Sequence, residues 1–239
     1  MIKIKKIIND FYEIHIFGDS HAKCFYRDPK IELGNVTMFN HYKGSVSMKG
    51  LTNPNSRLKY GEYIIEKLKS INNNVESKNI CVMKFGQVDI EYNYYFKLSK
   101  NQESVNKDEF YSTLIKNYIS HIKFLESEFK NIKFVINGTN MPNLYDIRNY
   151  IKTSIGFDPN EITYEEQYNN HYIFNQKLKE MCDSENITYF DLTDETTVNK
   201  KVKPEFVGKD NHFSGGEYVK IYNQNTYDVF VNKLINTII

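Results

Sequence analysis

The sequence predicts an α/β protein with a mostly parallel sheet of about five strands and helices on both faces of that sheet. Short apolar segments alternate along the chain with longer amphipathic segments, which is the pattern of repeated strand–helix–strand units. The strand segments are nearly continuous apolar runs, as expected for strands that are covered on both faces. The chain has 239 residues, a length that suits one such domain, and we expect a single domain over residues 1–239.

The expected strands are short runs rich in apolar residues. The first, at 13–17 (EIHIF), alternates apolar and other residues and ends at Gly18. The fourth, at 133–136 (KFVI), ends at the turn signal Asn137-Gly138. The full set of expected strands is 13–17, 35–39, 79–85, 133–136 and 187–192.

The segments between the strands carry apolar residues three and four positions apart, which predicts amphipathic helices. In the first of them, Ile64, Leu68 and Ile71 have this spacing. Ser214 is a suitable N-cap for the last helix. The expected helices are 56–71, 106–130, 163–184 and 214–236, and the segments 139–161 and 193–209 are expected to be loop-rich, as candidate insertions.

The charge and hydropathy of the chain exclude several classes of protein. The 31 Lys and Arg residues balance 30 Asp and Glu residues, which argues against a nucleic acid or a membrane surface as the partner. No run approaches the ~20 apolar residues that span a bilayer, and the apolar stretches of the basic N-terminal segment are too short for a signal peptide. We therefore expect a cytoplasmic protein.

The cysteines do not indicate a disulfide framework or a zinc site. Cys24, Cys81 and Cys182 stand far apart and form no Cys-x-x-Cys pair. Each lies among apolar residues, so a small buried side chain is the simplest interpretation. The Gly-x-Gly-x-x-Gly pattern of dinucleotide sites is absent after the first strand, and we expect neither a metal nor a cofactor.

Polar side chains follow three of the expected strands, at 18–21 (GDSH), 86–89 (GQVD) and 137–140 (NGTN). A fourth polar segment, at 210–212 (DNH), lies between the last strand and the last helix. In an open parallel sheet, ligands bind beyond the carboxyl ends of the strands. These four segments are therefore expected to meet at one site.

Ser20, Asp210 and His212 are the residue types that nucleophilic catalysis requires. A serine hydroxyl needs an imidazole to accept its proton, and the imidazole needs a carboxylate to orient it. Asp210 stands two residues before His212, so both side chains point the same way in an extended backbone. Asp191 or Asp194 could orient the ring instead. Each motif alone has an ordinary structural explanation, a turn or a helix cap, and it is their coincidence that favours a catalytic site.

These segments resemble the blocks of the SGNH (GDSL-like) hydrolases, a family of esterases, lipases and carbohydrate deacetylases. Gly18-Asp19-Ser20 matches the first block, with His21 in place of the usual Leu. Gly50 matches the glycine of the second block, and Gly44 is the alternative. Gly86 and Asp89 match the third block of the family, but Val88 stands where the family has Asn. Asp210-x-His212 is one residue shorter than the family's last block.

The resemblance implies a three-layer α/β/α sandwich of the flavodoxin-like type and an activity on small acyl esters. Ser20 would be the nucleophile, and an oxyanion hole would be formed by Ser20, Gly50 and Gln87, with Asn140 as a substitute for Gln87. The expected reaction is hydrolysis or transfer of a small acyl group, with acetyl on carbohydrate as the first choice of substrate. The candidate substrate-binding residues are Asp19, His21, Asp89, Asn140 and Tyr92.

Two alternatives belong to other functional classes. A metallophosphoesterase could use Asp19-x-His21 and Asp210-x-His212 as metal ligands, but the other motifs of that family are absent. A glycan-binding module that has kept the fold without the chemistry could stack sugar rings on Tyr92, Tyr94 and Tyr95. A half-buried structural role is the simpler explanation for those tyrosines.

Overall fold

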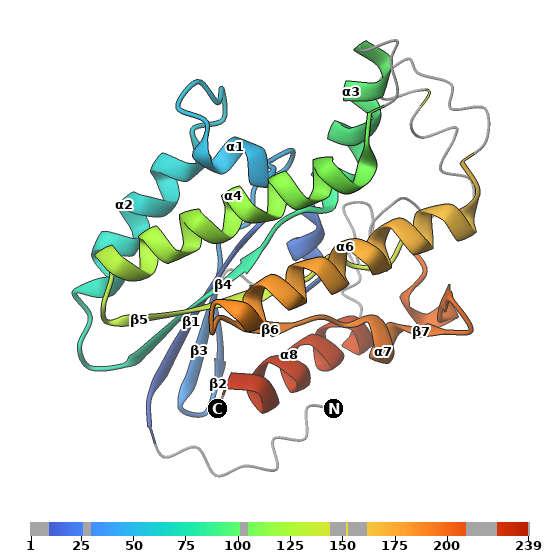
Figure 1. The fold of residues 1–239 in the computed structure, drawn as a ribbon. Helices are drawn as coiled ribbons and strands as arrows, with labels where there is room; N and C mark the ends of the chain where they lie inside the picture. The colour runs from blue at the N-terminus through green and yellow to red at the C-terminus, as the bar shows by residue number, and fades with distance from the viewer. Residues whose placement is uncertain are drawn as a thin grey trace.

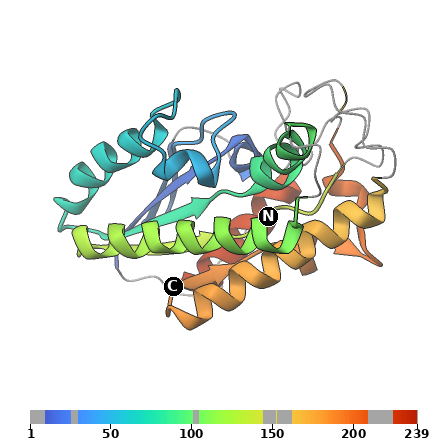
Figure 2. The same ribbon diagram turned by 45° about the horizontal axis from the view of Figure 1, so that its top comes forward.

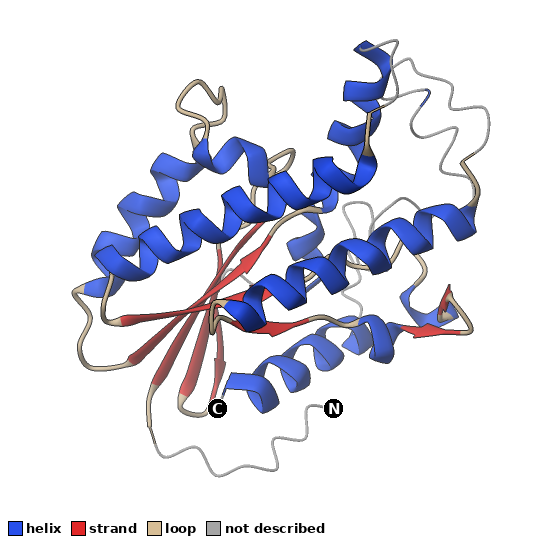
Figure 3. Ribbon diagram, viewed as in Figure 1, coloured by secondary structure: helices blue, strands red, loops and turns tan. Residues whose placement is uncertain are grey.

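The computed structural model describes residues 10–25, 30–100, 105–143, 152, 162–208 and 224–238. Within these ranges the centre of the molecule is a sheet of six strands in the order β2-β3-β1-β4-β5-β6 (Figures 1 and 3). The strands are β1 (Tyr12–Gly18), β2 (Lys30–Leu33), β3 (Val36–Asn40), β4 (Lys78–Lys84), β5 (Ile132–Asn137) and β6 (Thr188–Phe190).

Five of these strands, β3-β1-β4-β5-β6, run parallel, and β2 pairs antiparallel with β3 at one edge. Numbered among themselves, the parallel strands have the order 2-1-3-4-5 of flavodoxin-like folds. The prediction of a mostly parallel five-stranded sheet is confirmed. The sequence analysis missed β2, a four-residue strand that turns into β3 through Gly34 and Asn35, and Gly34 supplies the positive φ of +61°.

Helices cover both faces of the sheet, giving three layers (Figure 1). One face carries α2 (Tyr60–Asn72), α4 (Lys107–Glu128) and α6 (Tyr164–Ser184), and α4 and α6 lie side by side (Figure 2). The other face carries α8 (Gln224–Ile238) and the 3-10 helix η1 (Ser20–Phe25). No helix in the described ranges is long and apolar enough to cross a membrane.

The side chains of each strand alternate between these two layers. On β4, Cys81 and Met83 belong to the core cluster under α2, α4 and α6. Ile80 and Val82 belong to the cluster under α8. Because both faces are apolar, the strand reads as an unbroken apolar run in the sequence.

The helices differ from their expected bounds where local turns intervene. The segment 53–59 forms turns before α2, and Lys59 has the left-handed φ of 49°, so the helix begins at Tyr60 rather than at 56. α4 and α6 begin close to their predicted starts, with Asn106 and Thr163 as N-caps. Ser214 and the rest of 209–223 lie outside the described residues.

Several short elements were not expected from the sequence. The short helix α1 (Met48–Thr52), the π-helical turn η2 (Asp89–Asn93) and α3 (Tyr94–Lys100) lie at the carboxyl end of the sheet. The segment 193–208, the described part of an expected loop-rich region, contains several short hydrogen-bonded elements. These elements are α7 (Thr193–Thr196), β7 (Thr197–Val198), β8 (Lys201–Val202) and η3 (Pro204–Phe206).

Gly18 marks a close approach of β1 and β4 at the point where the site begins. A Cβ at this position would lie 2.6 Å from the carbonyl oxygen of Lys84 and 2.8 Å from Cβ of Ala22. The first contact is with the backbone, which has little freedom to move. The sequence therefore needs glycine here for reasons of space.

We expect Gly18→Ala to lower the free energy of unfolding by about 1–3 kcal/mol, the usual cost of forcing an extra group into a packed site. Gly44→Ala is the matched control, because a Cβ at Gly44 has no atom within 4 Å. Urea denaturation of the two variants checks the expectation. Equal stability of Gly18→Ala and the wild type would contradict the packing described for β1 and β4.

Candidate active site

The candidate site lies where the strand order reverses. β1 and β4 are neighbours, and the chain moves away from them in opposite directions across the sheet. Their carboxyl ends meet at Gly18 and Lys84, which are register partners, and the backbone N–H of Asp19 donates to the carbonyl of Lys84 at 3.2 Å. Ligands of open parallel sheets bind at such a switch point.

Ser20 is the first residue of η1 and lies between two buried charged side chains. Asp19 is 0% exposed and His21 is 2% exposed, whereas Ser20 is partly exposed. The Oδ1 atom of Asp19 accepts from the backbone N–H of His21 at 2.9 Å. The backbone carbonyl of Asp19 accepts from the backbone N–H of Ala22 at 3.1 Å. The turn thus directs its two charged neighbours inward and leaves Ser20 at the surface.

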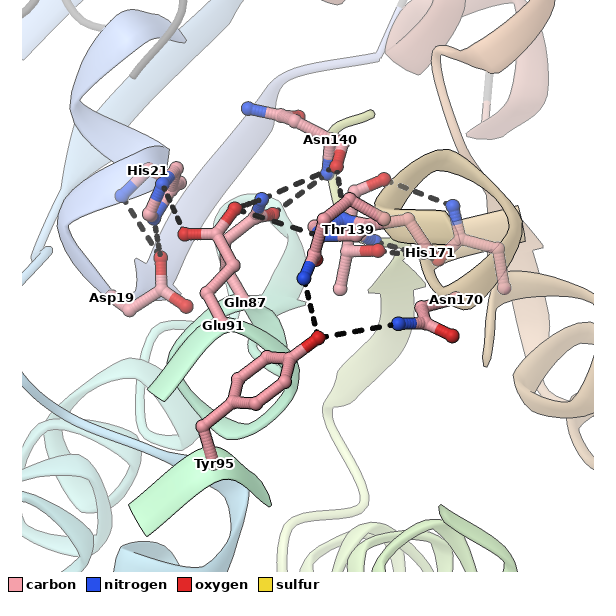
Figure 4. A network of polar contacts seen from close by, with 11 residues as sticks. Asp19, His21, Gln87, Glu91, Tyr95, Thr139, Asn140, Asn170 and His171 are labelled. Carbon is pink, nitrogen blue, oxygen red and sulfur yellow. Dashed lines mark hydrogen bonds and ion pairs between the residues drawn. The ribbon is translucent and has the colours of Figure 1, made fainter. Parts of the chain in front are cut away.

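A line of four buried side chains runs inward from this turn (Figure 4). Nδ1 of His21 lies 3.3 Å from Oδ1 of Asp19, and Nε2 of His21 lies 3.7 Å from Oε2 of Glu91. The other Glu91 oxygen lies 3.6 Å from Nε2 of His171 on α6. Nδ1 of His171 lies 2.8 Å from the carbonyl oxygen of Asn140.

Gln87 joins this line to the loop that follows β5. Its Nε2 donates to Oε1 of Glu91 at 2.6 Å and to the carbonyl of Asn140 at 3.2 Å. Its Oε1 accepts from the backbone N–H of Asn140 at 2.9 Å. The amide of Gln87 is therefore engaged at both ends, and an oxyanion role for it would require one of these bonds to open.

Comparison with solved structures finds the same architecture in acyl-processing enzymes. The M. smegmatis aryl esterase matches at a TM-score of 0.55 and 8% identity, over 95% of this chain and 99% of the esterase. A GDSL-like lipase from Bacteroides thetaiotaomicron matches at 0.51 and 12% identity, over 95% of this chain and 89% of the lipase. The periplasmic domain of the lipopolysaccharide acetyltransferase from Salmonella ser. Paratyphi A matches at a TM-score of 0.52 and 13% identity, over 96% of this chain and 85% of that domain.

The chain has the SGNH hydrolase fold. No family model matches its sequence, and no curated protein does. At identities of this order the likeness establishes the fold. The chemistry has to be argued from the residues at the site.

The two candidate glycines of the second SGNH block have different surroundings. The backbone N–H of Gly50 donates to Ser47, the N-cap of α1. It donates to the Oγ atom of Ser47 at 3.1 Å and to the backbone carbonyl of Ser47 at 3.0 Å. Gly44 follows Lys43, whose backbone N–H donates to the carbonyl of Gly18 at 3.0 Å. The loop that contains Gly44 is therefore attached to the end of β1, one residue before Asp19.

Asp89 of the third SGNH block is fully buried and holds two segments together. Its Oδ2 accepts from the backbone N–H of Met48 at 2.7 Å, and its Oδ1 accepts from Nδ2 of Asn93 at 2.8 Å. The aspartate thus fixes η2 against the start of α1. Val88, which stands at the position of the SGNH asparagine, is partly exposed beside it.

Burial and neighbouring charges set the pKa values at the site. Burial alone would lower the pKa of His21, but the carboxylates of Asp19 and Glu91 outweigh it and leave this pKa raised. Burial lowers the pKa of His171, although Glu91 opposes it. Burial raises the pKa of Asp89 to about 6 against the effect of its two hydrogen bonds. The line therefore favours a charged His21 and a neutral His171.

The remaining predicted residues are placed as follows. Asp210 and His212 lie outside the described residues, so their arrangement with Ser20 stays a prediction. Asp191, one alternative acid, accepts from the backbone N–H of Thr193 and from the Tyr189 hydroxyl in its own turn. The second alternative, Asp194, lies in α7.

The expected aromatic surface is smaller than the sequence suggests. Tyr94 and Tyr95 are buried, and the Tyr95 hydroxyl bonds to Gln167 and Asn170 of α6 (Figure 4). Tyr92 is partly exposed and stacks on Phe96, with ring centroids 6.2 Å apart. Tyr92 thus remains a candidate substrate contact, whereas its two neighbours are core residues.

The described residues do not form a group of three or more His, Cys, Asp or Glu side chains that could hold a metal ion. Asp19 and His21, the first pair of the metallophosphoesterase alternative, contact each other. His21 continues to Glu91, so these atoms form a line instead of converging on a point.

The sequence analysis missed three polar residues of the site. Glu91 and His171 form the inner part of the line, and Lys84 donates from the end of β4 to the carbonyl of Gly138 at 2.8 Å. Lys84 could have been found from the sequence, because a lysine inside the apolar run NICVMKF indicates a buried and paired amino group. Lys84 is 2% exposed, so its amino group is held within the protein.

We expect the stability of the wild type to fall, relative to Asp89→Asn, as pH rises from 4 to about 6. The pKa of Asp89 is raised to about 6 in the folded protein from 3.8, so the folded state binds this proton more tightly than the unfolded state. Below pH 4, protonated Asp89 contributes on the order of 3 kcal/mol at most to the free energy of unfolding. This contribution is lost as the pH rises to about 6.

Urea denaturation of both proteins from pH 4 to 7 measures this difference. Asp108→Asn, which changes an exposed carboxylate, is the control. A stability of the wild type relative to Asp89→Asn that stays constant or rises with pH would contradict the environment described for Asp89.

Proposed function

We propose that the protein is a serine esterase of the SGNH type that hydrolyses or transfers a small acyl group, with acetyl on carbohydrate as the substrate class. The observation that carries the proposal is the position of Ser20. This serine is partly exposed, begins a helical turn at the switch point of an SGNH fold, and lies between two inward-facing charged residues. The GDSL-like lipase and the aryl esterase among the structural neighbours support the reaction class.

The proposed reaction begins with attack of the Ser20 oxygen on the acyl carbon. His212 accepts the serine proton and returns it to the leaving alcohol, and Asp210 orients the imidazole. Water then attacks the acyl-enzyme, and His212 accepts a proton from the water. His212 returns this proton to the Ser20 oxygen as the bond between that oxygen and the acyl carbon breaks and the acid is released. A sugar hydroxyl in place of water would give acyl transfer, and a lipopolysaccharide acetyltransferase is among the structural neighbours.

The oxyanion of the tetrahedral intermediate needs hydrogen-bond donors close to Ser20. We assign this role to the backbone N–H groups of Ser20 and Gly44. Gly44 is preferred to Gly50 because Gly50 already donates within the cap of α1, whereas the Gly44 loop is attached to Gly18. Gln87 is committed to Glu91 and Asn140, so the donor lost at Val88 has no evident replacement there.

A small cavity lies beside this loop. Its volume is about 40 Å³, and Ser45, Ser47, Gly50 and Leu51 are among its lining residues. The partly exposed ring of Tyr92 is the proposed contact for the sugar.

We expect Ser20→Ala and His212→Ala each to lower turnover of p-nitrophenyl acetate by on the order of 10³-fold or more, because nucleophile and base act as a unit. A fluorophosphonate probe is expected to label Ser20. Ser127→Ala, which changes an exposed serine of α4, is the control that should keep both activity and labelling. Full activity of Ser20→Ala, combined with its loss on treatment with EDTA, would favour the metallophosphoesterase.

Val88→Asn is expected to raise kcat/KM on a small acetyl ester. The amide would restore the donor that the SGNH pattern has at this position, and such a donor contributes ~3 kcal/mol, or about 10²-fold in rate. Val88→Leu is the matched control, because leucine has the same number of side-chain heavy atoms and the same branching at Cγ as asparagine, without the amide. Circular dichroism verifies that both variants fold.

The outcome separates three cases. A rise in Val88→Asn alone means that the oxyanion hole of the wild type lacks a donor. No rise, together with a large loss in Gln87→Ala, means that Gln87 supplies the donor. No turnover in the wild type or in either variant, together with a Ser20 that does not react with the probe, would contradict the esterase and favour the glycan-binding module.

A further inference from the structure

The line Asp19–His21–Glu91–His171 holds more buried charge than packing alone requires. The side chains of all four residues are at most 3% exposed. The SGNH pattern has leucine at the position of His21, and leucine would fill that space without any charged partner. A buried charge is stable only when it is paired, and removal of one partner leaves the other uncompensated.

The line connects the Ser20 turn to three other segments of the site. Asp19 and His21 belong to the turn after β1, Glu91 to η2, and His171 to α6. His171 also contacts the carbonyl of Asn140, in the loop after β5. Glu91 occupies the centre, because its two oxygens face one histidine each and Oε1 also accepts from Gln87.

His21 is the member of the line that acts directly on the turn. It follows Ser20 in the chain, and its ring lies between Asp19 on one side and Glu91 on the other (Figure 4). With both carboxylates in place, the ring is held inward. If one were lost, His21 would be freer to rotate and Ser20 would move with it.

We propose that Glu91 is a positioning residue for Ser20 and acts through His21. The role rests on the proposed function, since it concerns the geometry of the serine nucleophile. Glu91 does not touch the reacting atoms. It fixes the Ser20 turn against η2 and α6, so that the serine oxygen is held in one place relative to the donors of the oxyanion hole.

The charged groups around His21 predict how this role depends on pH. Asp19 of its own turn and Glu91 of η2 raise the pKa of the imidazole, Lys84 of β4 lowers it, and His171 of α6 lies on the far side of Glu91. Replacement of Glu91 by glutamine removes one of the two carboxylates. His21 should then lose its proton at a lower pH than in the wild type.

The test compares Glu91→Gln with the wild type. We expect kcat on p-nitrophenyl acetate to fall about 10- to 100-fold, as small misplacements of catalytic groups do, with KM within about twofold. The rate of fluorophosphonate labelling should fall with kcat, and the alkaline loss of activity should begin at a lower pH. Glu195→Gln is the control for loss of a paired carboxylate away from the line, since Glu195 is partly buried and forms a 2.6 Å ion pair with Lys233.

A double-mutant cycle with His21→Leu tests whether Glu91 acts through His21. If it does, the losses in kcat will not add, and Glu91→Gln/His21→Leu will be no worse than the poorer single variant. Additive losses would overturn the proposal. So would labelling of Glu91→Gln at the wild-type rate and with the wild-type pH profile.

Imidazole NMR on the wild type keeps the proposal testable if Glu91→Gln does not fold. A His21 titration above the ordinary histidine pKa supports the paired imidazolium, and one below it overturns the proposal. If wild-type Ser20 does not react with the probe at all, the proposed function fails and the positioning role fails with it. If wild-type Ser20 reacts and Glu91→Gln is indistinguishable from it, the positioning role alone fails.

Discussion

The ion pairs of His21 with Asp19 and Glu91 are the interaction on which the candidate site depends. The two side chains that flank Ser20 both point into the protein, where they pair with each other, and Glu91 of the interior is a second partner for His21. Their inward direction leaves Ser20 between them at the surface. A buried charge that loses its partner destabilises the folded state. The pairs of His21 with Asp19 and Glu91 therefore favour this one arrangement of the turn.

The same interaction organises the neighbouring loops. Gln87 and His171 both bond to the main chain of Asn140, so the loop after β5 is fixed to η2 and α6. Asp89, two residues before Glu91, fixes the start of α1. The segments that follow β1, β4 and β5 are therefore linked by polar contacts beneath the surface, at the end of the sheet where SGNH folds place their chemistry.

The sheet and the main helices could be predicted because their apolar residues have a regular spacing. Each of the five parallel strands coincides with an apolar run. β2 was missed because four residues give too short a pattern, and η2 because a π-helical turn has no simple period. Ser20 was found by its position after the first strand, whereas Glu91 and His171 had no such signal.

The face of α6 shows why apolar spacing fails near the site. Tyr168 and Tyr172 lie four residues apart, a spacing that by itself predicts one buried stripe, but Tyr172 is 46% exposed and His171 is fully buried. The inward face of this helix carries polar residues because it lies against the charged line. Apolar periodicity therefore predicts the position of the helix correctly but misses the polar part of its buried face.

A crystal structure of the protein after reaction with a fluorophosphonate would test the central claim most directly. The account predicts phosphorus bound to the Ser20 oxygen, a phosphonyl oxygen within hydrogen-bond distance of the N–H groups of Ser20 and Gly44, and His21 still held between Asp19 and Glu91. Phosphorus on another residue, or an unmodified Ser20 with the His21 ring turned away from the two carboxylates, would contradict it.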